Sequence, residues 1–177
     1  MPNEAPARPS VIGLTSSFGK ARSMVFPRSI LAGHGVLPEL GSMCRQFDFP
    51  DRGAVITGST TVTLAGRRAA EILNESKFDV ATIIAHDATS AEVERVLGEV
   101  RSAGARFLIA VGGGSKIDIA KVAAARAHLP FVSVPTSAAH DGISSPRASL
   151  RDPGKVTSEA AVVPMGILAD TSVIVQA

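Results

Sequence analysis

The sequence predicts an α/β fold in which a mostly parallel sheet has helices on both faces. Short, continuously apolar runs typical of buried strands alternate along the chain with runs of helical periodicity. Strands that helices cover on both sides are apolar throughout, as these runs are. Turns rich in Gly, Ser, Thr, His or Asp follow four of the runs, at the sheet edge where α/β proteins bind ligands.

Length and composition bound the class of protein. The chain has 177 residues, 45% of them hydrophobic, which is enough to bury the core of one globular domain. A net charge of +2 and the absence of Trp and Tyr argue against a nucleic-acid partner. No apolar run is long enough to span a membrane. Cys44 cannot form an internal disulfide, so we interpret it as a small buried residue of a cytoplasmic protein rather than a nucleophile.

The amino-terminal part divides into a tail and the start of the domain. Residues 1–25 contain scattered Pro, Gly and Ser, which predicts a flexible tail. Residues 26–177 are expected to form one α/β domain, and the turns described below predict that it is nucleotide-binding. A strand is expected over 28–32 and an amphipathic helix over 36–47. His34 lies in the Gly turn between them, where we interpret it as a solvated turn residue rather than a ligand.

The next strand–turn–helix unit has two interpretations. The β-branched run 53–57 predicts a buried strand, and a helix is expected over 62–74. Hydroxyls of Ser59, Thr60 and Thr61 lie in the turn between them. They either meet a nucleotide together with backbone amides or simply cap the helix.

An acidic residue follows the third strand. A strand is expected over 78–85 and a helix from Thr89 to about 103. Asp87 lies between them, where nucleotide-binding folds commonly place the carboxylate that accepts ribose hydroxyls. That contact would favour NADH, because a carboxylate repels a 2′-phosphate, although His86 beside it would soften the preference. Alternatively, Asp87 is only a helix-start residue.

The stretch from Phe107 to Asp118 predicts a phosphate site. A strand ends in Gly112, Gly113 and Gly114, and a helix is expected over 116–127. Glycines can adopt φ > 0 and let the backbone approach a ligand, while the free amides and dipole of the helix favour an anion. Asp118 lies in the first helical turn, where it stabilises the helix or accepts a ligand hydroxyl. The alternative is an ordinary Gly-rich strand–helix turn.

The last third begins with a strand over 130–134 and a long turn over 135–146. In that turn His140 and Asp141 either hold a substrate hydroxyl and relay a proton or form an Asx-type turn. Extended runs at 148–151 and 156–163 flank a Pro-Gly turn and predict a β-hairpin, and further strands are expected over 166–169 and 173–175, with no closing helix.

Several common motifs are missing. The four histidines are far apart, with no His-x-x-x-His or Cys-x-x-Cys spacing, so no metal ligands are assigned. Gly-x-Gly-x-x-Gly, a Walker-type lysine pattern and Gly-x-Ser-x-Gly are also missing, and no catalytic residue is assigned.

Three stretches together resemble the sn-glycerol-1-phosphate dehydrogenase family. They are GGGSKIDIAK at 112–121, PFVSVPTSAAHDGISSPRASL at 130–150 and ILADT at 167–171. The resemblance extends from about Phe26 to the last residue. This family is similar to glycerol dehydrogenase, iron-dependent alcohol dehydrogenases and dehydroquinate synthase, so a Rossmann-like sheet is implied.

The resemblance implies a zinc-dependent enzyme that reduces dihydroxyacetone phosphate to sn-glycerol 1-phosphate with NADH or NADPH, in the synthesis of archaeal-type phospholipids. By position, Gly114, Ser115, Lys116, Ile117 and Asp118 would contact the dinucleotide diphosphate. Thr136, Ser137, Ala138, Ala139 and Ser145 would also line the cofactor, and Asp141 would bind the substrate near the carbon that receives hydride. Ala139 departs from the family, which commonly has a hydroxyl residue there.

The resemblance also places the zinc ligands, one aspartate and two histidines, in a helical carboxyl-terminal half, so they are expected beyond Ala177. We therefore expect these 177 residues to bind NAD(P) without turnover and to self-associate through apolar surface left bare. Three alternatives stay open: glycerol dehydrogenase, a lyase of the dehydroquinate-synthase type that uses NAD transiently, and a non-catalytic nucleotide-binding module.

Overall fold

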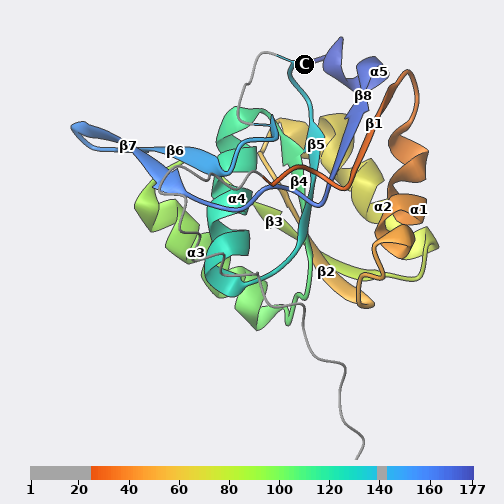
Figure 1. The fold of residues 1–177 in the computed structure, drawn as a ribbon, viewed down its shortest axis with the longest axis horizontal. Coiled ribbons are helices and arrows are strands. Elements are labelled where there is room, and N and C mark those ends of the chain that lie inside the picture. The colour runs from red at the N-terminus through yellow and green to blue at the C-terminus, as the bar shows by residue number, and fades with distance from the viewer. Residues whose placement is uncertain (1–24, 139–142) are drawn as a thin grey trace, which may run out of the picture.

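A single parallel sheet forms the centre of the molecule. The structure, a computed structural model, describes residues 25–138 and 143–177. Six strands lie in the order β1-β8-β5-β4-β2-β3, and every neighbouring pair is parallel (Figure 1). Their bounds are β1 Ser29–Gly33, β2 Arg52–Thr57, β3 Asp79–Ile84, β4 Leu108–Gly112, β5 Phe131–Pro135 and β8 Gly166–Asp170. The predicted α/β fold is confirmed.

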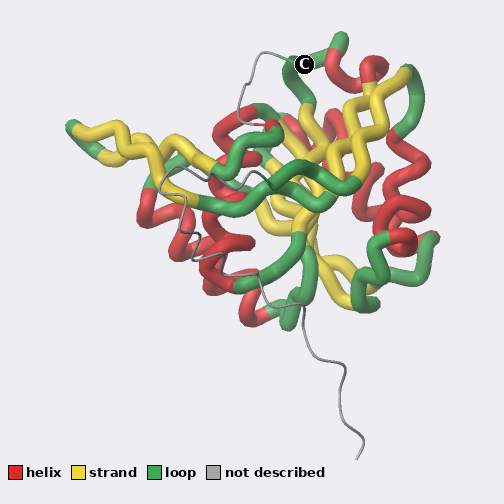
Figure 2. Tube along the Cα trace, in the orientation of Figure 1, coloured by secondary structure: helices red, strands yellow, loops and turns green. Residues whose placement is uncertain are grey.

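Helices cover both faces of this sheet (Figure 2). One face packs against α3 and α4, and the other packs against η1, α1, η2 and α2. Their bounds are η1 Leu37–Glu39, α1 Leu40–Gln46, η2 Val62–Gly66, α2 Arg67–Glu75, α3 Ser90–Ser102, α4 Gly114–Ala127 and α5 Thr171–Ile174.

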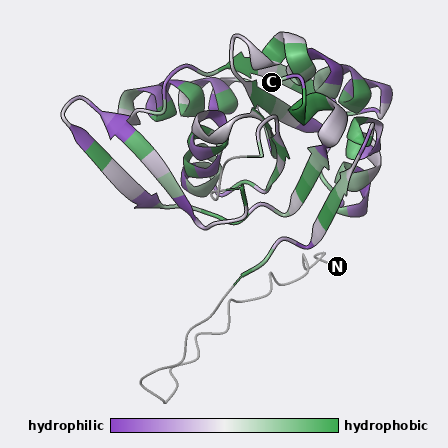
Figure 3. Ribbon diagram, turned by 90° about the horizontal axis from the view of Figure 1, so that it is seen from above, coloured by the Kyte–Doolittle hydropathy of each residue, from purple (hydrophilic) through white to green (hydrophobic). Residues whose placement is uncertain are grey.

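The strand β4 shows why the central runs are apolar throughout. All its residues are buried. Leu108 and Ala110 face the core under α3 and α4, whereas Ile109 and Val111 face the core under α1 and α2. Because successive side chains point to opposite faces, a strand between two cores has no position that faces solvent, so most of its residues are apolar. Figure 3 shows this concentration of hydrophobic residues along the inner strands.

A separate antiparallel hairpin packs against α4. Its strands are β6 Arg147–Asp152 and β7 Lys155–Ala160, so the predicted hairpin is confirmed. Ala148 and Leu150 on β6 are buried in the core beneath α4, while Val156 on β7 is exposed. The hairpin therefore packs on the core through β6, while Glu159 on the outer strand β7 accepts from Nη2 of Arg126 on α4 at 2.9 Å (Figure 1).

One predicted element and the starts of two predicted helices differ from the structure, and the expectation of no closing helix was wrong. Residues 173–175 are not a strand: Asp170 accepts a hydrogen bond from the Ser172 amide, which starts the short helix α5. The helix expected over 36–47 begins as the 3₁₀ turn η1 with Pro38 in its first turn. The helix expected from Lys116 begins at Gly114, because Gly113 occupies its N-cap.

Cys44 is a buried residue of α1, as predicted. Burial raises the pKa of its thiol to about 12, so almost no thiolate exists at neutral pH. The side chain therefore packs as a small apolar group in the core under α1 and α2.

Ser133 in β5 provides a test of this core. Its hydroxyl is fully buried and has no hydrogen-bond partner among the described residues. Because an unsatisfied buried hydroxyl costs free energy, we expect Ser133→Ala to raise the free energy of unfolding by about 1 kcal/mol. Urea unfolding of the two proteins measures this difference. A loss of stability in the variant would contradict the prediction and would mean that the hydroxyl makes a favourable contact.

Candidate functional site

The first turn of α4 lies at the carboxyl edge of the sheet, directly after β4. Gly113, the N-cap residue, is extended, with φ −74° and ψ −178°, and the helix begins at Gly114. The first amides of a helix have no partner within it, and the helix dipole makes this end favourable for an anion. The described glycines with positive φ are Gly35, Gly104 and Gly154, so the expectation that positive φ explains this glycine run was wrong.

Close packing explains Gly112 better. A Cβ atom on Gly112 would lie 2.8 Å from Cβ and Cγ of Lys116, and one on Gly58 would lie 2.7 Å from Cε of Lys116. The aliphatic stem of this lysine therefore crosses the ends of β4 and β2 where only glycine leaves room. Its ammonium group donates to the His86 carbonyl at 2.5 Å and to Oγ of Ser115 at 3.0 Å.

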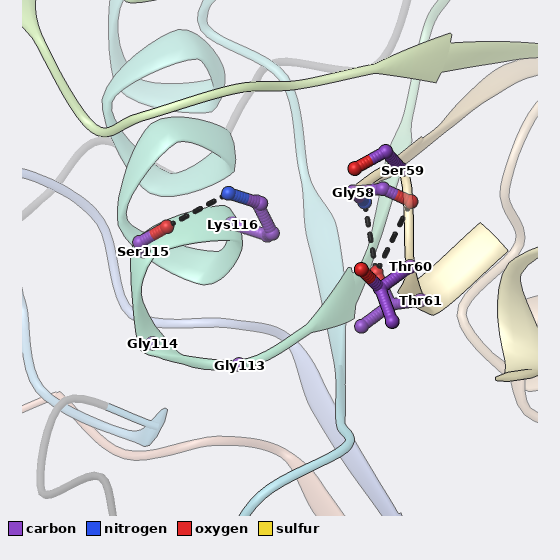
Figure 4. A pocket seen from close by; sticks show the side chains of 8 residues that line it. All are labelled: Gly58, Ser59, Thr60, Thr61, Gly113, Gly114, Ser115 and Lys116. Atoms are coloured by element: carbon purple, nitrogen blue, oxygen red, sulfur yellow. Dashed lines mark hydrogen bonds between the residues drawn. The ribbon is translucent and has the colours of Figure 1, made fainter. Parts of the chain in front are cut away.

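A pocket of about 350 Å³ opens beside this lysine, and we call it the Lys116 pocket. Its lining residues come from the turn after β2 and from the start of α4, and Figure 4 shows the two walls facing each other. They are Gly58, Ser59, Thr60, Thr61, Gly113, Gly114, Ser115 and Lys116. The pocket thus combines hydroxyls, helix-start amides and one cation.

The hydroxyls of the turn after β2 differ in their roles. Oγ1 of Thr61 accepts from the Gly58 amide at 2.8 Å (Figure 4). It also lies 2.9 Å from Oγ1 of Thr57, so it shapes the turn. At the N-cap of η2, Thr61 makes no side-chain capping hydrogen bond. Ser59 and Thr60 are exposed at the mouth of the pocket. The capping alternative therefore does not describe Thr61, and the other two hydroxyls face solvent.

A second pocket of about 560 Å³ lies on the other side of the helix start, and we call it the Asp87 pocket. It shares Gly114 and Ser115 with the Lys116 pocket. Its lining residues are Asp87, Ala88, Thr89, Gly114, Ser115, Asp118, Ser149 and Arg151. The two pockets therefore adjoin at the first turn of α4, and we refer to them together as the groove.

Asp87 is exposed and is not the residue that starts α3. The N-cap of α3 is Thr89, whose hydroxyl accepts from the Glu92 amide at 3.2 Å. The buried Glu92 accepts from the His86 amide at 2.8 Å and so fixes the segment next to Asp87. Hydrogen bonds from Arg95, and from that amide, outweigh burial and lower the pKa of Glu92. Glu92 thus holds the backbone next to Asp87, and the exposed Asp87 lines the pocket.

Asp118 has a structural role in addition to its place in the groove. It is 4% exposed, and its Oδ2 accepts from the Ser149 amide at 3.1 Å. Its Oδ1 lies 3.7 Å from Nζ of the fully buried Lys121, which donates to the Arg147 carbonyl at 3.0 Å. This carboxylate and this ammonium therefore attach the hairpin strand β6 to α4.

The segment after β5 is only partly described. Thr136 is buried, and its amide donates to the Gly112 carbonyl at 3.0 Å, so it follows β5 next to the glycine run. Ser137 is half-buried and Ala138 is exposed. Oγ of Ser145 accepts from the Arg147 amide at 3.1 Å, and this residue lines neither pocket. Ala139, His140 and Asp141 lie outside the described residues.

Sequence reasoning missed part of the groove. Ser149 and Arg151 of the hairpin, together with Thr89, line the Asp87 pocket. Asp152 accepts from the amide and hydroxyl of Ser90 at 2.8 and 2.6 Å, which holds the hairpin against α3. No local pattern could have indicated that the hairpin folds onto this edge of the sheet.

The described part of the chain contains neither a metal-binding cluster nor a membrane-spanning helix. Across residues 25–138 and 143–177, no cluster of three or more His, Cys, Asp or Glu side chains could hold a metal ion. The zinc ligands that the resemblance places beyond Ala177 are not among these residues, so they stay a prediction. No helix in those same ranges has the length and apolar character needed to cross a bilayer.

The sequence matches a known protein family. Residues 31–177 match the model of the family described as iron-containing alcohol dehydrogenase. Glycerol-1-phosphate dehydrogenase [NAD(P)+] of Methanosarcina barkeri is 43% identical over 161 residues, 91% of this chain and 45% of that protein. The same-named protein of Thermoplasma volcanium is 42% identical over 160 residues, 90% of this chain and 46% of that protein. The chain thus spans about half the length of the curated relatives it matches.

Solved structures share the fold. Glycerol dehydrogenase from Schizosaccharomyces pombe superposes with a TM-score of 0.79 at 22% identity, over 89% of this chain and 41% of that one. NADH-dependent butanol dehydrogenase A from Thermotoga maritima gives a TM-score of 0.77 at 17% identity, over 87% and 45% respectively. At these identities the likeness concerns the fold alone.

Proposed function

The chain belongs to the iron-containing alcohol dehydrogenase family, and we propose that it is the NAD(P)-binding part of an enzyme that interconverts dihydroxyacetone phosphate and sn-glycerol 1-phosphate. The names of relatives more than 40% identical over nine-tenths of the chain support the substrate. The observation that supports the cofactor is the groove over the first turn of α4, where amides, hydroxyls and the Lys116 ammonium converge.

The groove suits a dinucleotide because its two pockets meet at the helix start. We expect the diphosphate to lie over Gly114 and Ser115, the residues common to both pockets, where free amides and the dipole stabilise negative charge. One nucleoside would then extend into each pocket. On this arrangement Asp87 accepts hydroxyls of the ribose on its side.

Chemistry at the substrate requires groups beyond this groove. The resemblance implies zinc, which would supply a Lewis acid for the substrate carbonyl. The described residues do not fit such an ion, since they contain no group of three or more metal-binding side chains. What these residues do is bind and orient the cofactor. Asp141 as a substrate ligand, and Thr136, Ser137, Ala138, Ala139 and Ser145 as cofactor contacts, stay predictions.

Binding and turnover test the two halves of this proposal separately. Calorimetric titration of the 177-residue chain with NAD+ and NADP+ is expected to show saturable binding of at least one dinucleotide. The same chain is expected to show no turnover with dihydroxyacetone phosphate, NAD(P)H and zinc, since its described residues hold no metal group. Absence of binding would contradict the cofactor assignment, and measurable turnover would contradict the need for groups outside this groove.

The substrate is tested on the polypeptide that the natural gene encodes. We expect oxidation of NAD(P)H that depends on dihydroxyacetone phosphate and yields the sn-1 enantiomer of glycerol phosphate. Oxidation of free glycerol alone would instead indicate a glycerol dehydrogenase, and transient use of NAD without net consumption would indicate a lyase. Self-association and a cytoplasmic location stay predictions. The exposed Ile30 in the edge strand β1, and the exposed Phe26 just before it, favour self-association.

A further inference from the structure

The two pockets of the groove differ in charge. The Lys116 pocket is lined by four hydroxyl residues, three glycines and one lysine, with no acidic side chain in its lining. The Asp87 pocket is lined by two carboxylates, Asp87 and Asp118, and one guanidinium, Arg151. A dianionic phosphate is attracted to ammonium and hydroxyl groups and repelled by carboxylates. The first pocket therefore offers a phosphate one cation and hydrogen-bond donors, with no carboxylate in its lining. In the second pocket Lys121 offsets the charge of Asp118, and the exposed Asp87 carboxylate suits sugar hydroxyls better than a second phosphate.

The Lys116 ammonium has neutral partners. It donates to the His86 carbonyl and to Oγ of Ser115, and no carboxylate within 25–138 or 143–177 forms an ion pair with it. Packing over Gly58 and Gly112 holds its stem at the pocket. A hydrogen bond from an ammonium group to a phosphate is stronger than one to a neutral carbonyl. An incoming phosphate could therefore replace the His86 carbonyl as the partner of Lys116.

Building on the proposed function, we propose that Lys116, with the hydroxyls of Ser59 and Thr60, binds the 2′-phosphate of the adenosine ribose and makes NADP(H) the preferred cofactor. The diphosphate lies over the helix start that both pockets share. The adenosine ribose then extends toward the turn after β2, whose exposed hydroxyls face Lys116 across the pocket (Figure 4). The second phosphate lies between these two walls.

This arrangement reverses a preference that the sequence suggested. Asp87 would favour NADH only if the adenosine ribose lay beside it, because its carboxylate would repel a 2′-phosphate there. With that ribose in the Lys116 pocket, Asp87 faces the unphosphorylated ribose of the other nucleoside. Its charge then has no influence on the choice between the two cofactors.

Nucleotide pairs that differ only in the 2′-phosphate measure its contribution to binding. Calorimetry on the 177-residue chain compares 2′,5′-ADP with 5′-AMP, and NADP+ with NAD+. The phosphorylated member of each pair is expected to bind at least about 10-fold more tightly, the scale of a charge-assisted hydrogen bond. Lys116→Met is expected to remove most of this ratio, and Lys116→Arg to keep part of it. Lys155→Met, the same change on the exposed hairpin strand β7, is expected to keep all of it.

Each outcome distinguishes this inference from the proposed function. If NAD+ and NADP+ bind equally well, the groove is a dinucleotide site and the preference is overturned. If Lys116→Met weakens binding of 5′-AMP and 2′,5′-ADP by the same factor, the lysine serves the phosphate that both share, and the inference is again overturned. If no nucleotide binds to a chain whose thermal unfolding is cooperative, both proposals fail.

Discussion

Replacing Gly113 with Asp is expected to weaken binding of the dinucleotide about 100-fold or more while leaving the fold intact. A Cβ atom at this position meets nothing within 4 Å, and the backbone, with φ −74°, suits any residue. The new carboxylate would lie in the Lys116 pocket next to the expected diphosphate. Two like charges about 4 Å apart repel by about 4 kcal/mol near a protein surface.

Stability and binding should change in opposite directions in this variant. Gly113 is the N-cap of α4, where Asp is preferred over Gly by a few tenths of a kcal/mol, so the unfolding temperature should stay level or rise. Gly113→Ala introduces a side chain without charge and is expected to bind within about threefold of the parent. Gly98→Asp places the same charge on α3, where a Cβ atom meets nothing within 4 Å, and should leave the affinity for the dinucleotide unchanged. If Gly113→Asp bound NADP+ as tightly as the parent does, the diphosphate could not lie next to residue 113, and the proposed position would be wrong.

Removing the carboxylate of Asp170 is expected to lower the free energy of unfolding by about 3 kcal/mol. This residue is 2% exposed and ends β8. Its oxygens accept from the amides of Gly35 at 2.9 Å, Leu37 at 2.8 Å and Ser172 at 2.8 Å, and from the Ser172 hydroxyl at 2.6 Å. Asp170→Ala leaves these donors without an acceptor, at about 1–3 kcal/mol for each one that stays buried. Urea unfolding measures the loss.

The contribution of Asp170 should also depend on pH. Burial opposes the charged carboxylate, but its hydrogen bonds outweigh burial and lower its pKa. The stabilisation is therefore fully present above the ordinary aspartate pKa of about 3.9 and is lost as the pH falls through the lower folded value. The difference in stability between the parent and Asp170→Ala should shrink there. Thr171→Ala, which removes only the exposed bond to the Gly33 carbonyl, should cost less than about 1 kcal/mol at every pH. A pH-independent loss in Asp170→Ala would rule out the carboxylate's charge as its cause.

Two parts of the groove, the start of α4 and the hairpin, differ in how well the sequence could predict them. Gly113 to Asp118 are consecutive residues at a strand–helix junction, and the position of that junction follows from the local pattern alone. Ser149 and Arg151 reach the same groove through a hairpin more than 30 residues further along the chain. Their position depends on Leu150 burying against α4 and on the Asp118 carboxylate binding a hairpin amide. Neither contact has a local signature.

By itself, the sequence determined that this protein is a parallel α/β sheet with ligand-like turns at one edge. It could do so because a buried strand or helix needs apolar residues at regular spacing, and this spacing can be read from consecutive residues alone. Only the tertiary structure decided that the glycines at 58 and 112 make room for one lysine, that Asp170 joins β8 to the turn after β1, and that the hairpin forms a wall of the groove. These features are contacts between residues distant in sequence, and their geometry follows from how the elements pack and not from the composition of any one of them.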